Sequence, residues 1–215
     1  MTAAGVTSLA PGPVVEFYFG LGSRYSYLAA SQLTALAAES GAAFDWLPVD
    51  SAKLIETRGD NPFKVAKAAG QYDWDYRRRD AEAWAEYYGI PFREPHGRLA
   101  LDPDLLSRAA VTARRLGAVE PYARASFAAI FVEERTRIDR ALCAELAERA
   151  GLERTRFEGE LDSSASRAEQ ERILRQALAR GAFGVPTFFA GGRLFWGNDR
   201  LALLRHHLMR EGRIG

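Results

Sequence analysis

The sequence has very little cysteine and histidine, with one cysteine and three histidines among 215 residues. A lone thiol excludes a disulfide within the chain, and Cys143 lies in a helical pattern between Ile138 and Leu146. A free cysteine in an apolar pattern is typically a small buried residue. The adjacent residues His206 and His207 would point about 100° apart on a helix, which does not suit a shared metal ion. We therefore expect a buried thiol and no metal site.

Long hydrophobic runs and an excess of one charge are also absent. No segment approaches the roughly 18 apolar residues of a membrane-spanning helix. Lysine and arginine total 29 and aspartate and glutamate total 28, so the net charge of +1 gives no electrostatic footprint for nucleic acid or an anionic membrane. The first twelve residues lack the basic start and apolar centre of a secretory signal. These absences favour a cytoplasmic protein without nucleic-acid or membrane partners.

The N-terminal part alternates short apolar runs with one helical pattern. Residues 14–19 are β-branched and aromatic and predict a buried strand, and residues 44–49 predict a second strand. Between them, apolar residues recur at helical spacing over residues 25–37. Glycines break the first strand, so Ser23 falls at the turn into the helix. This β-α-β order predicts two parallel neighbouring strands.

From about residue 52 to residue 180 the pattern is almost wholly helical. Gly117, Gly151 and Gly181 stand where helices are expected to stop. The basic run Arg77 to Arg79 lies among acidic residues, which is typical of a solvated helix face. The predicted helices centre on residues 81–88, 103–116, 119–134, 141–150, 152–161 and 165–180.

The C-terminal part predicts a hairpin followed by a helix. Residues 187–190 and 194–196 are apolar runs separated by two glycines, which is typical of a tight β-hairpin. Pro186 precedes the first run, at a strand start or edge, where a proline is tolerated and can follow a cis bond. Asn198 and Asp199 are good N-cap residues for the final helical pattern. They could also place polar groups beside an anionic or zwitterionic ligand.

These elements together predict an α/β protein. The outer parts, β-α-β and β-β-α, can join in one mixed sheet, with the helical part inserted between them. We therefore expect one discontinuous domain, residues 13–51 and 182–212, and one inserted all-α domain, residues 52–181.

The order of elements, with Val185 and Pro186 just before the third strand, resembles the thioredoxin fold. Proteins of that fold carry two redox cysteines at the N-terminus of the first helix, separated by two residues. The matching positions here are Ser23 and Ser26. Because a hydroxyl group cannot cycle through a disulfide, we expect no thiol–disulfide exchange.

A closer resemblance is to the bacterial 2-hydroxychromene-2-carboxylate isomerases and the related kappa-class glutathione transferases. Both are DsbA-like thioredoxin-fold proteins with a helical domain inside the thioredoxin-like domain. The resemblance spans residues 14 to about 208. The sequence departs from these families at Arg24, where they usually have proline, and at residues 70–75, which look inserted. The segments that carry the resemblance are residues 17–29, 76–80, 84–85, 88–91, 183–189 and 195–201.

The resemblance implies a glutathione site. Ser23 matches the family serine whose hydroxyl meets the glutathione sulfur, and it is the expected catalytic residue. The backbone of Val185, which the resemblance places before a cis Pro186, would pair with the cysteinyl unit. Asn198 and Asp199 would bind the γ-glutamyl group of glutathione. Asn61 would lie at the opposite side of the ligand.

The resemblance also implies the function, a glutathione-dependent isomerase of the 2-hydroxychromene-2-carboxylate type in aromatic catabolism. A small aromatic substrate, a pocket lined partly by aromatic side chains and a homodimer belong to the same expectation. Two alternatives stay open: a kappa-like glutathione transferase acting on electrophiles, and a non-redox thioredoxin-like module that binds an extended peptide. Without the family resemblance, the position of Ser23 is also explained by an ordinary helix N-cap. Both enzymes would use the same cofactor site, so the sequence does not separate them.

Overall fold

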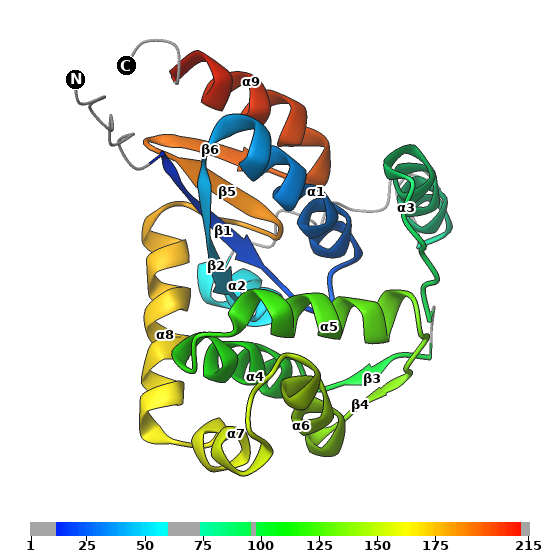
Figure 1. Cartoon of the computed structure of the whole chain (residues 1–215), viewed down its shortest axis with the longest axis vertical. Helices are drawn as coiled ribbons and strands as arrows, with labels where there is room; N and C mark the ends of the chain where they lie inside the picture. Colours follow the sequence, from blue (N-terminus) through cyan, green and yellow to red (C-terminus); the bar gives the residue numbers. More distant parts are fainter. Residues whose placement is uncertain (1–11, 60–73, 96–97, 212–215) are drawn as a thin grey trace, which may run out of the picture.

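A computed structural model of the chain shows one mixed sheet at the centre of the molecule (Figure 1). The structure describes residues 12–59, 74–95 and 98–211. The sheet consists of β1 (Val14–Phe19), β2 (Ala43–Pro48), β5 (Thr187–Ala190) and β6 (Arg193–Trp196). Their order across the sheet is β2-β1-β5-β6. The pairing of β1 with β2 is parallel, and the pairings of β1 with β5 and of β5 with β6 are antiparallel. The mixed sheet predicted from the two ends of the sequence is confirmed.

Helices connect and cover these strands, as the 3.6-residue pattern predicted, and a further helix at residues 51–58 was not among those predicted. The short strands β3 (Ala100–Leu101) and β4 (Arg137–Ile138) were not predicted, because two residues are too few for a strand alternation to show. The helices are α1 (Arg24–Ser40), α2 (Ser51–Arg58), α3 (Trp74–Tyr88), α4 (Pro103–Arg115), α5 (Val119–Phe131), α6 (Arg140–Arg149), α7 (Arg154–Leu161), α8 (Ser164–Ala179) and α9 (Leu201–Glu211).

The sheet separates two apolar layers. Phe17 of β1 belongs to the larger core together with residues of α1 and α9, whereas Tyr18 belongs to a smaller cluster with Ile173 of α8. Successive residues of a strand point to opposite faces, so this alternation places helices on both sides of the sheet. Accordingly, α8 runs along one side of the strands and α1 along the other (Figure 1).

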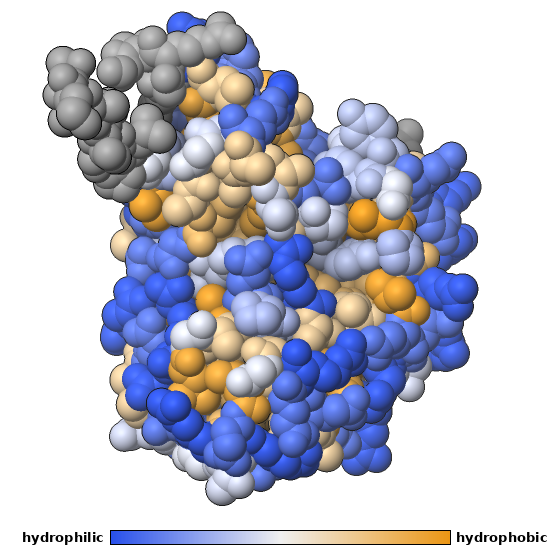
Figure 2. All heavy atoms as spheres, in the orientation of Figure 1, coloured by the Kyte–Doolittle hydropathy of each residue, from blue (hydrophilic) through white to orange (hydrophobic). Residues whose placement is uncertain are grey.

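The larger core continues from the sheet into the helical part. It contains Phe17 and Phe188 of the sheet together with Phe127 of α5 and Phe157 of α7. The division into a sheet domain and an inserted domain of residues 52–181 stays a prediction. On the face shown in Figure 2, hydrophilic residues cover most of the surface and apolar residues form small separate clusters. No helix in the described ranges is long and apolar enough to cross a bilayer.

The turn after β6 differs from the predicted N-cap. Asn198 and Asp199 do not cap α9 but begin a 3-10 turn, Asn198–Arg200, which leads directly into Leu201. The residue before this turn is Gly197, which has no side chain that could cap it. The side chains of asparagine and aspartate hydrogen-bond to nearby backbone groups both in short turns and at helix N-caps. The sequence pattern therefore does not distinguish a turn from an N-cap at these positions.

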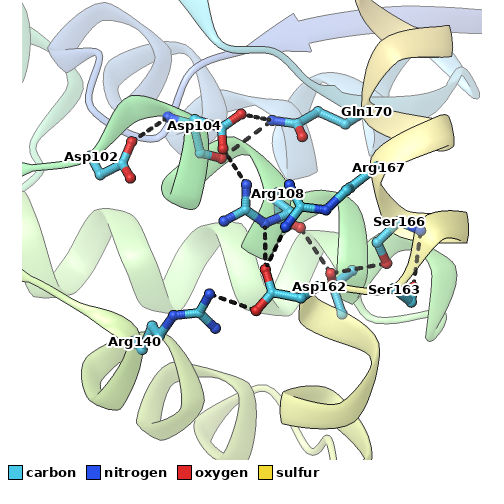
Figure 3. Close-up of polar contacts among 10 residues, drawn as sticks. Asp102, Asp104, Arg108, Arg140, Asp162, Ser163, Ser166, Arg167 and Gln170 are labelled. Atoms are coloured by element: carbon cyan, nitrogen blue, oxygen red, sulfur yellow. Dashed lines mark hydrogen bonds and ion pairs between the residues drawn. The ribbon is translucent and has the colours of Figure 1, made fainter.

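A network of charged and polar side chains joins several helices of the helical part (Figure 3). Arg108 of α4 is only 5% exposed. Its guanidinium pairs with Asp104 one helical turn earlier, and its Nε lies 3.3 Å from Oδ1 of Asp162. The carboxylate of Asp162 also pairs with Arg140 at 2.5 Å and with Arg167 at 3.1 Å. Since Asp162 lies between α7 and α8, one carboxylate joins four helices.

We expect Asp162→Asn to lower the free energy of unfolding at pH 7 by about 1 kcal/mol or less, since the Asp162 side chain is 40% exposed and solvent screens its ion pairs. The hydrogen bond from Arg140 holds the pKa of Asp162 below its ordinary value. A lowered folded-state pKa contributes stability above the unfolded-state pKa of about 3.9, and this contribution disappears as the pH falls through the folded-state pKa. Urea unfolding at pH 7 and at successively lower pH tests this, because a stability difference that does not shrink as the pH falls would contradict it.

Cys143 of α6 is fully buried, as predicted, and burial raises the pKa of its thiol to about 11. The thiolate is the reactive form of cysteine, so we expect the folded protein to resist an aromatic disulfide reagent at neutral pH. After denaturation, the reagent should titrate the one cysteine of the sequence. Equal reaction rates for the folded and the denatured protein would show that the thiol is accessible.

Candidate active site

Ser23 ends the turn after β1 and caps α1, as the sequence predicted. Its Oγ accepts a hydrogen bond from the backbone N–H of Ser26 at 3.2 Å, and its own backbone is extended, with φ of −93° and ψ of 116°. This bond uses an oxygen lone pair rather than the hydroxyl hydrogen. The Oγ–H group can therefore still donate to a ligand at the N-terminus of α1.

The loop before β5 lies against the Ser23 turn. The peptide bond between Val185 and Pro186 is cis, as the family resemblance implied. The carbonyl oxygen of Pro186 accepts a hydrogen bond from Gly197 N at 2.9 Å, which ties this loop to the end of β6. A Cβ atom added at Gly20 would lie 3.3 Å from Cγ2 of Val185. Glycine at that position thus allows the two turns to approach closely.

The turn after β6 presents polar groups beside this loop. Gly197 has a φ of 104°, a conformation that favours glycine. Asn198 is 3% exposed, and its Nδ2 has no hydrogen-bond partner among the described residues. The backbone oxygen of Asn198 accepts a bond from the Tyr88 hydroxyl at 3.3 Å. Asp199 is exposed and pairs with Arg200 at 2.5 Å. A buried amide N–H without a partner is unfavourable, so Nδ2 is well suited to bind a ligand.

These segments line one cavity of about 620 Å³. Ser51 and Ile55 of α2 add to its lining. The structure brings together five of the six expected site residues, and Asn61 lies outside the described residues. No group of three or more His, Cys, Asp or Glu side chains in the described part of the chain could hold a metal ion. The expected site residues that line the cavity are Ser23, Val185, Pro186, Asn198 and Asp199.

One wall of the cavity is α3, which contributes aromatic side chains to the pocket, as the sequence led us to expect. Tyr76, Asp80 and Trp84 line this wall. The hydroxyl of Tyr25, on α1, donates to Oδ2 of Asp80 at 2.8 Å across the cavity lining. Tyr76 and Trp84 provide the expected aromatic lining, whereas no local pattern in the sequence indicated the contact between Tyr25 and Asp80.

The basic run on α3 is only partly the solvated face that was predicted. Arg78 pairs with Glu82 at 2.9 Å, one helical turn later, as expected of such a face. Arg77, in contrast, is half-buried and lines the cavity. Adjacent residues of a helix point about 100° apart, so one run of arginines serves both the outside and the cavity.

Arg24 adds a buried cation next to Ser23. Its side chain is 9% exposed, and its Nη2 lies 2.7 Å from Oε1 of Glu94, whose side chain is 13% exposed. Arg24 lines the cavity as well. The guanidinium and the N-terminus of α1 both favour an anionic ligand atom beside Ser23, and Glu94 offsets part of this charge.

A wider groove of about 880 Å³ adjoins the cavity between α1, α3 and α9. It shares Trp84, Asn198 and Asp199 with the cavity. Tyr87 lines it with a side chain that is 78% exposed. The groove therefore presents aromatic surface next to the site.

The family model of the DSBA-like thioredoxin domain matches residues 14–209. The chain is thus a DsbA-like protein of the thioredoxin fold. It is 30% identical over 199 residues to a 2-hydroxychromene-2-carboxylate isomerase of Pseudomonas sp. (strain C18), which covers 90% of this chain and 89% of that protein. At this identity and coverage, the chain belongs to the family of 2-hydroxychromene-2-carboxylate isomerases.

Solved structures agree with this assignment. A structure of 2-hydroxychromene-2-carboxylate isomerase matches with a TM-score of 0.78 and 28% identity, covering 93% of this chain and 96% of that one. The cytosolic disulfide reductase DsbM from Pseudomonas aeruginosa with GSH has a TM-score of 0.64 and 19% identity, covering 93% and 99%, and shares the fold. The predicted thioredoxin-like fold and the predicted family are both confirmed.

Proposed function

We propose that this protein is a glutathione-dependent isomerase of a 2-hydroxychromene-2-carboxylate, acting in the cytoplasm in the breakdown of an aromatic compound. The observation that carries the proposal is the position of Ser23. Its hydroxyl stands at the N-terminus of α1, in the same cavity as the Val185 loop and the Asn198 turn. The isomerases to which the chain is related carry the name of this reaction.

The described residues fit glutathione. The γ-glutamyl end of glutathione is a zwitterion, and it would meet the unpartnered Nδ2 of Asn198 and the exposed carboxylate of Asp199. The backbone of Val185, beside the cavity, would hold the cysteinyl unit. The DsbM structure with GSH supports this choice of ligand for the fold.

Bound glutathione would supply the thiol nucleophile for a reversible addition to the conjugated chromene. Ser23 would donate its Oγ–H to the sulfur, and the N-terminus of α1 with Arg24 would favour the anionic form. This assistance matters because a thiol with a pKa of about 8.5 is mostly protonated at neutral pH. Arg77 offers a cation to the substrate carboxylate, and Tyr76 and Trp84 offer flat apolar faces to the aromatic ring.

We expect Asp199→Ala to raise the dissociation constant of glutathione about tenfold, because a charge-assisted hydrogen bond contributes about 1.5–3 kcal/mol and solvent weakens an exposed one. The rate at saturating glutathione should change little, since the γ-glutamyl group takes no part in the chemistry. Titration calorimetry and saturation kinetics measure the two effects. Equal dissociation constants in the variant and the parent would remove Asp199 from the site.

Turnover with glutathione and a 2-hydroxychromene-2-carboxylate tests the function and separates it from its alternatives. An isomerase converts the substrate while the concentration of free thiol stays constant. A transferase consumes the thiol and releases a conjugate, and a binding module produces neither change. Failure of the parent protein to convert the substrate at saturating glutathione would reject the proposal.

A homodimer is the assembly that we expect, with the groove between α1, α3 and α9 as its contact face. Leu36, Trp84, Tyr88 and Leu201 line this groove, and Tyr87 is highly exposed there. Aromatic side chains are enriched in protein interfaces. Sedimentation velocity should give twice the chain mass of 23.8 kDa, and a monomer at micromolar concentration would contradict this expectation.

A further inference from the structure

Tyr25 and Asp80 form a hydrogen-bonded pair in the cavity that the glutathione site does not use. The distance from the Tyr25 hydroxyl to Oδ2 of Asp80 is 2.8 Å. Both side chains are half-buried, and both line the cavity that contains Ser23. Tyr25 follows Ser23 by two residues, so the phenol lies in the first turn of the same helix. A proton donor and a proton acceptor thus border the space where a substrate would bind.

The proposed substrate needs a proton transfer that is separate from the thiol chemistry. A 2-hydroxychromene is a cyclic hemiketal, and its ring must open before the double bond can rotate. In the opening step the 2-hydroxyl loses its proton, a carbonyl forms at C2, and the bond from C2 to the ring oxygen breaks. The ring oxygen leaves as a phenolate and takes up one proton. The step needs no oxidant or second reagent, only a group that accepts a proton at one oxygen and returns it at another.

We propose that Tyr25 is a catalytic residue for this ring opening and that Asp80 acts through it, an inference that rests on the proposed function. The proton of the substrate hydroxyl passes to the phenol oxygen of Tyr25 while the proton of Tyr25 passes to Asp80. The reverse transfers then protonate the phenolate oxygen of the opened substrate. A phenol accepts a proton readily only if it gives up its own, which is the role of the carboxylate at 2.8 Å.

Other contacts can hold α3 against α1 when the Tyr25 hydroxyl is removed. The hydroxyl of Tyr27 donates to the carbonyl oxygen of Pro91, and Arg24 pairs with Glu94 at 2.7 Å. Both contacts join the first turns of α1 to the segment that follows α3. Tyr25→Phe keeps the aromatic ring and should fold, so it removes the proton path without removing the wall of the cavity.

Ring opening can be measured apart from double-bond rotation. S-methylglutathione fills the glutathione part of the site without a thiol, and NMR exchange reports the interconversion of the closed hemiketal and the open cis keto acid. We expect Tyr25→Phe and Asp80→Asn each to slow the catalysed exchange on the order of a hundredfold. The substrate concentration for half-saturation should stay within about twofold, and the double variant should be no slower than either single variant, because the two groups act as a unit.

Asp75→Asn is the matched control, because Asp75 is an exposed carboxylate in the first turn of the same helix and does not line the cavity. It should exchange at the parent rate. Exchange at the parent rate in Tyr25→Phe would overturn the proposal. Losses that multiply in the double variant, or a parallel loss of glutathione affinity by calorimetry, would also overturn it, because they indicate a structural or cofactor-binding role. A parent protein that opens the ring but fails to isomerise with glutathione would reject only the proposed function.

Discussion

The Ser23→Ala variant is expected to fold and to convert substrate about a hundredfold more slowly than the parent, because removing one preorganised donor from a reacting anion has an effect of this size. The Ser23 hydroxyl is placed to donate to the glutathione sulfur, and alanine offers no donor. The loss of an N-cap should lower the free energy of unfolding by only about 0.5–2 kcal/mol. Steady-state kinetics at saturating glutathione and urea unfolding measure the two quantities separately.

Ser163→Ala supplies the matched control. Ser163 caps α8 in the same manner, with its Oγ accepting from Ser166 N at 3.1 Å, and it does not line the cavity. This variant should lose a similar amount of stability and keep the parent rate. If both variants lose activity equally, the effect of Ser23 is structural, and if Ser23→Ala keeps the parent rate, Ser23 has no part in the mechanism.

Phe17→Ala is expected to lower the free energy of unfolding by about 3–5 kcal/mol, the range for removing a large aromatic side chain from a core. Phe17 is fully buried, and its ring centroid lies 4.9 Å from those of both Phe188 and Trp46. These rings come from β5 and β2, so a cavity at Phe17 would weaken the sheet at its centre. Domains are typically stable by only about 5–15 kcal/mol, so a large part of the total would be lost.

Val14→Ala is the control on the same strand. Val14 is 62% exposed, and such a surface substitution should change stability by no more than about 0.5 kcal/mol. Guanidinium unfolding of the two variants compares the two positions. A loss below about 1 kcal/mol in Phe17→Ala would mean that the core collapses around the missing ring.

The features that could be predicted from the sequence are those that repeat or lie close together along the chain. The apolar runs of β1 and β2 and the helical spacing of α1 predict their own local structure. Ser23 was found as a cap because the strand and the helix on either side mark the turn. The family resemblance then joined Ser23 to Val185 and Asn198, which local patterns alone do not bring together.

The features that were missed are contacts between distant segments and choices between similar local structures. Nothing near Arg24 indicates that Glu94 will neutralise it, and nothing near Tyr25 indicates Asp80. These pairs exist because α3 and the segment after it pack on the first turns of α1. The 3-10 turn at Asn198 was missed for another reason, since the same residues also favour an N-cap.

The place of β5 inside the sheet also determines when a newly synthesised chain can become active. During synthesis β1 can pair with β2 early, but its other edge stays open until the whole helical part has been made and β5 arrives. An open edge beside Phe17 is the kind of surface on which unfinished chains aggregate. The hairpin of β5 and β6 closes that edge and brings Val185 and Asn198 to the cavity in the same event. In cell-free translation, catalysis should therefore appear only after β6 has left the ribosome, while chains stalled before β5 should remain inactive and dependent on chaperones.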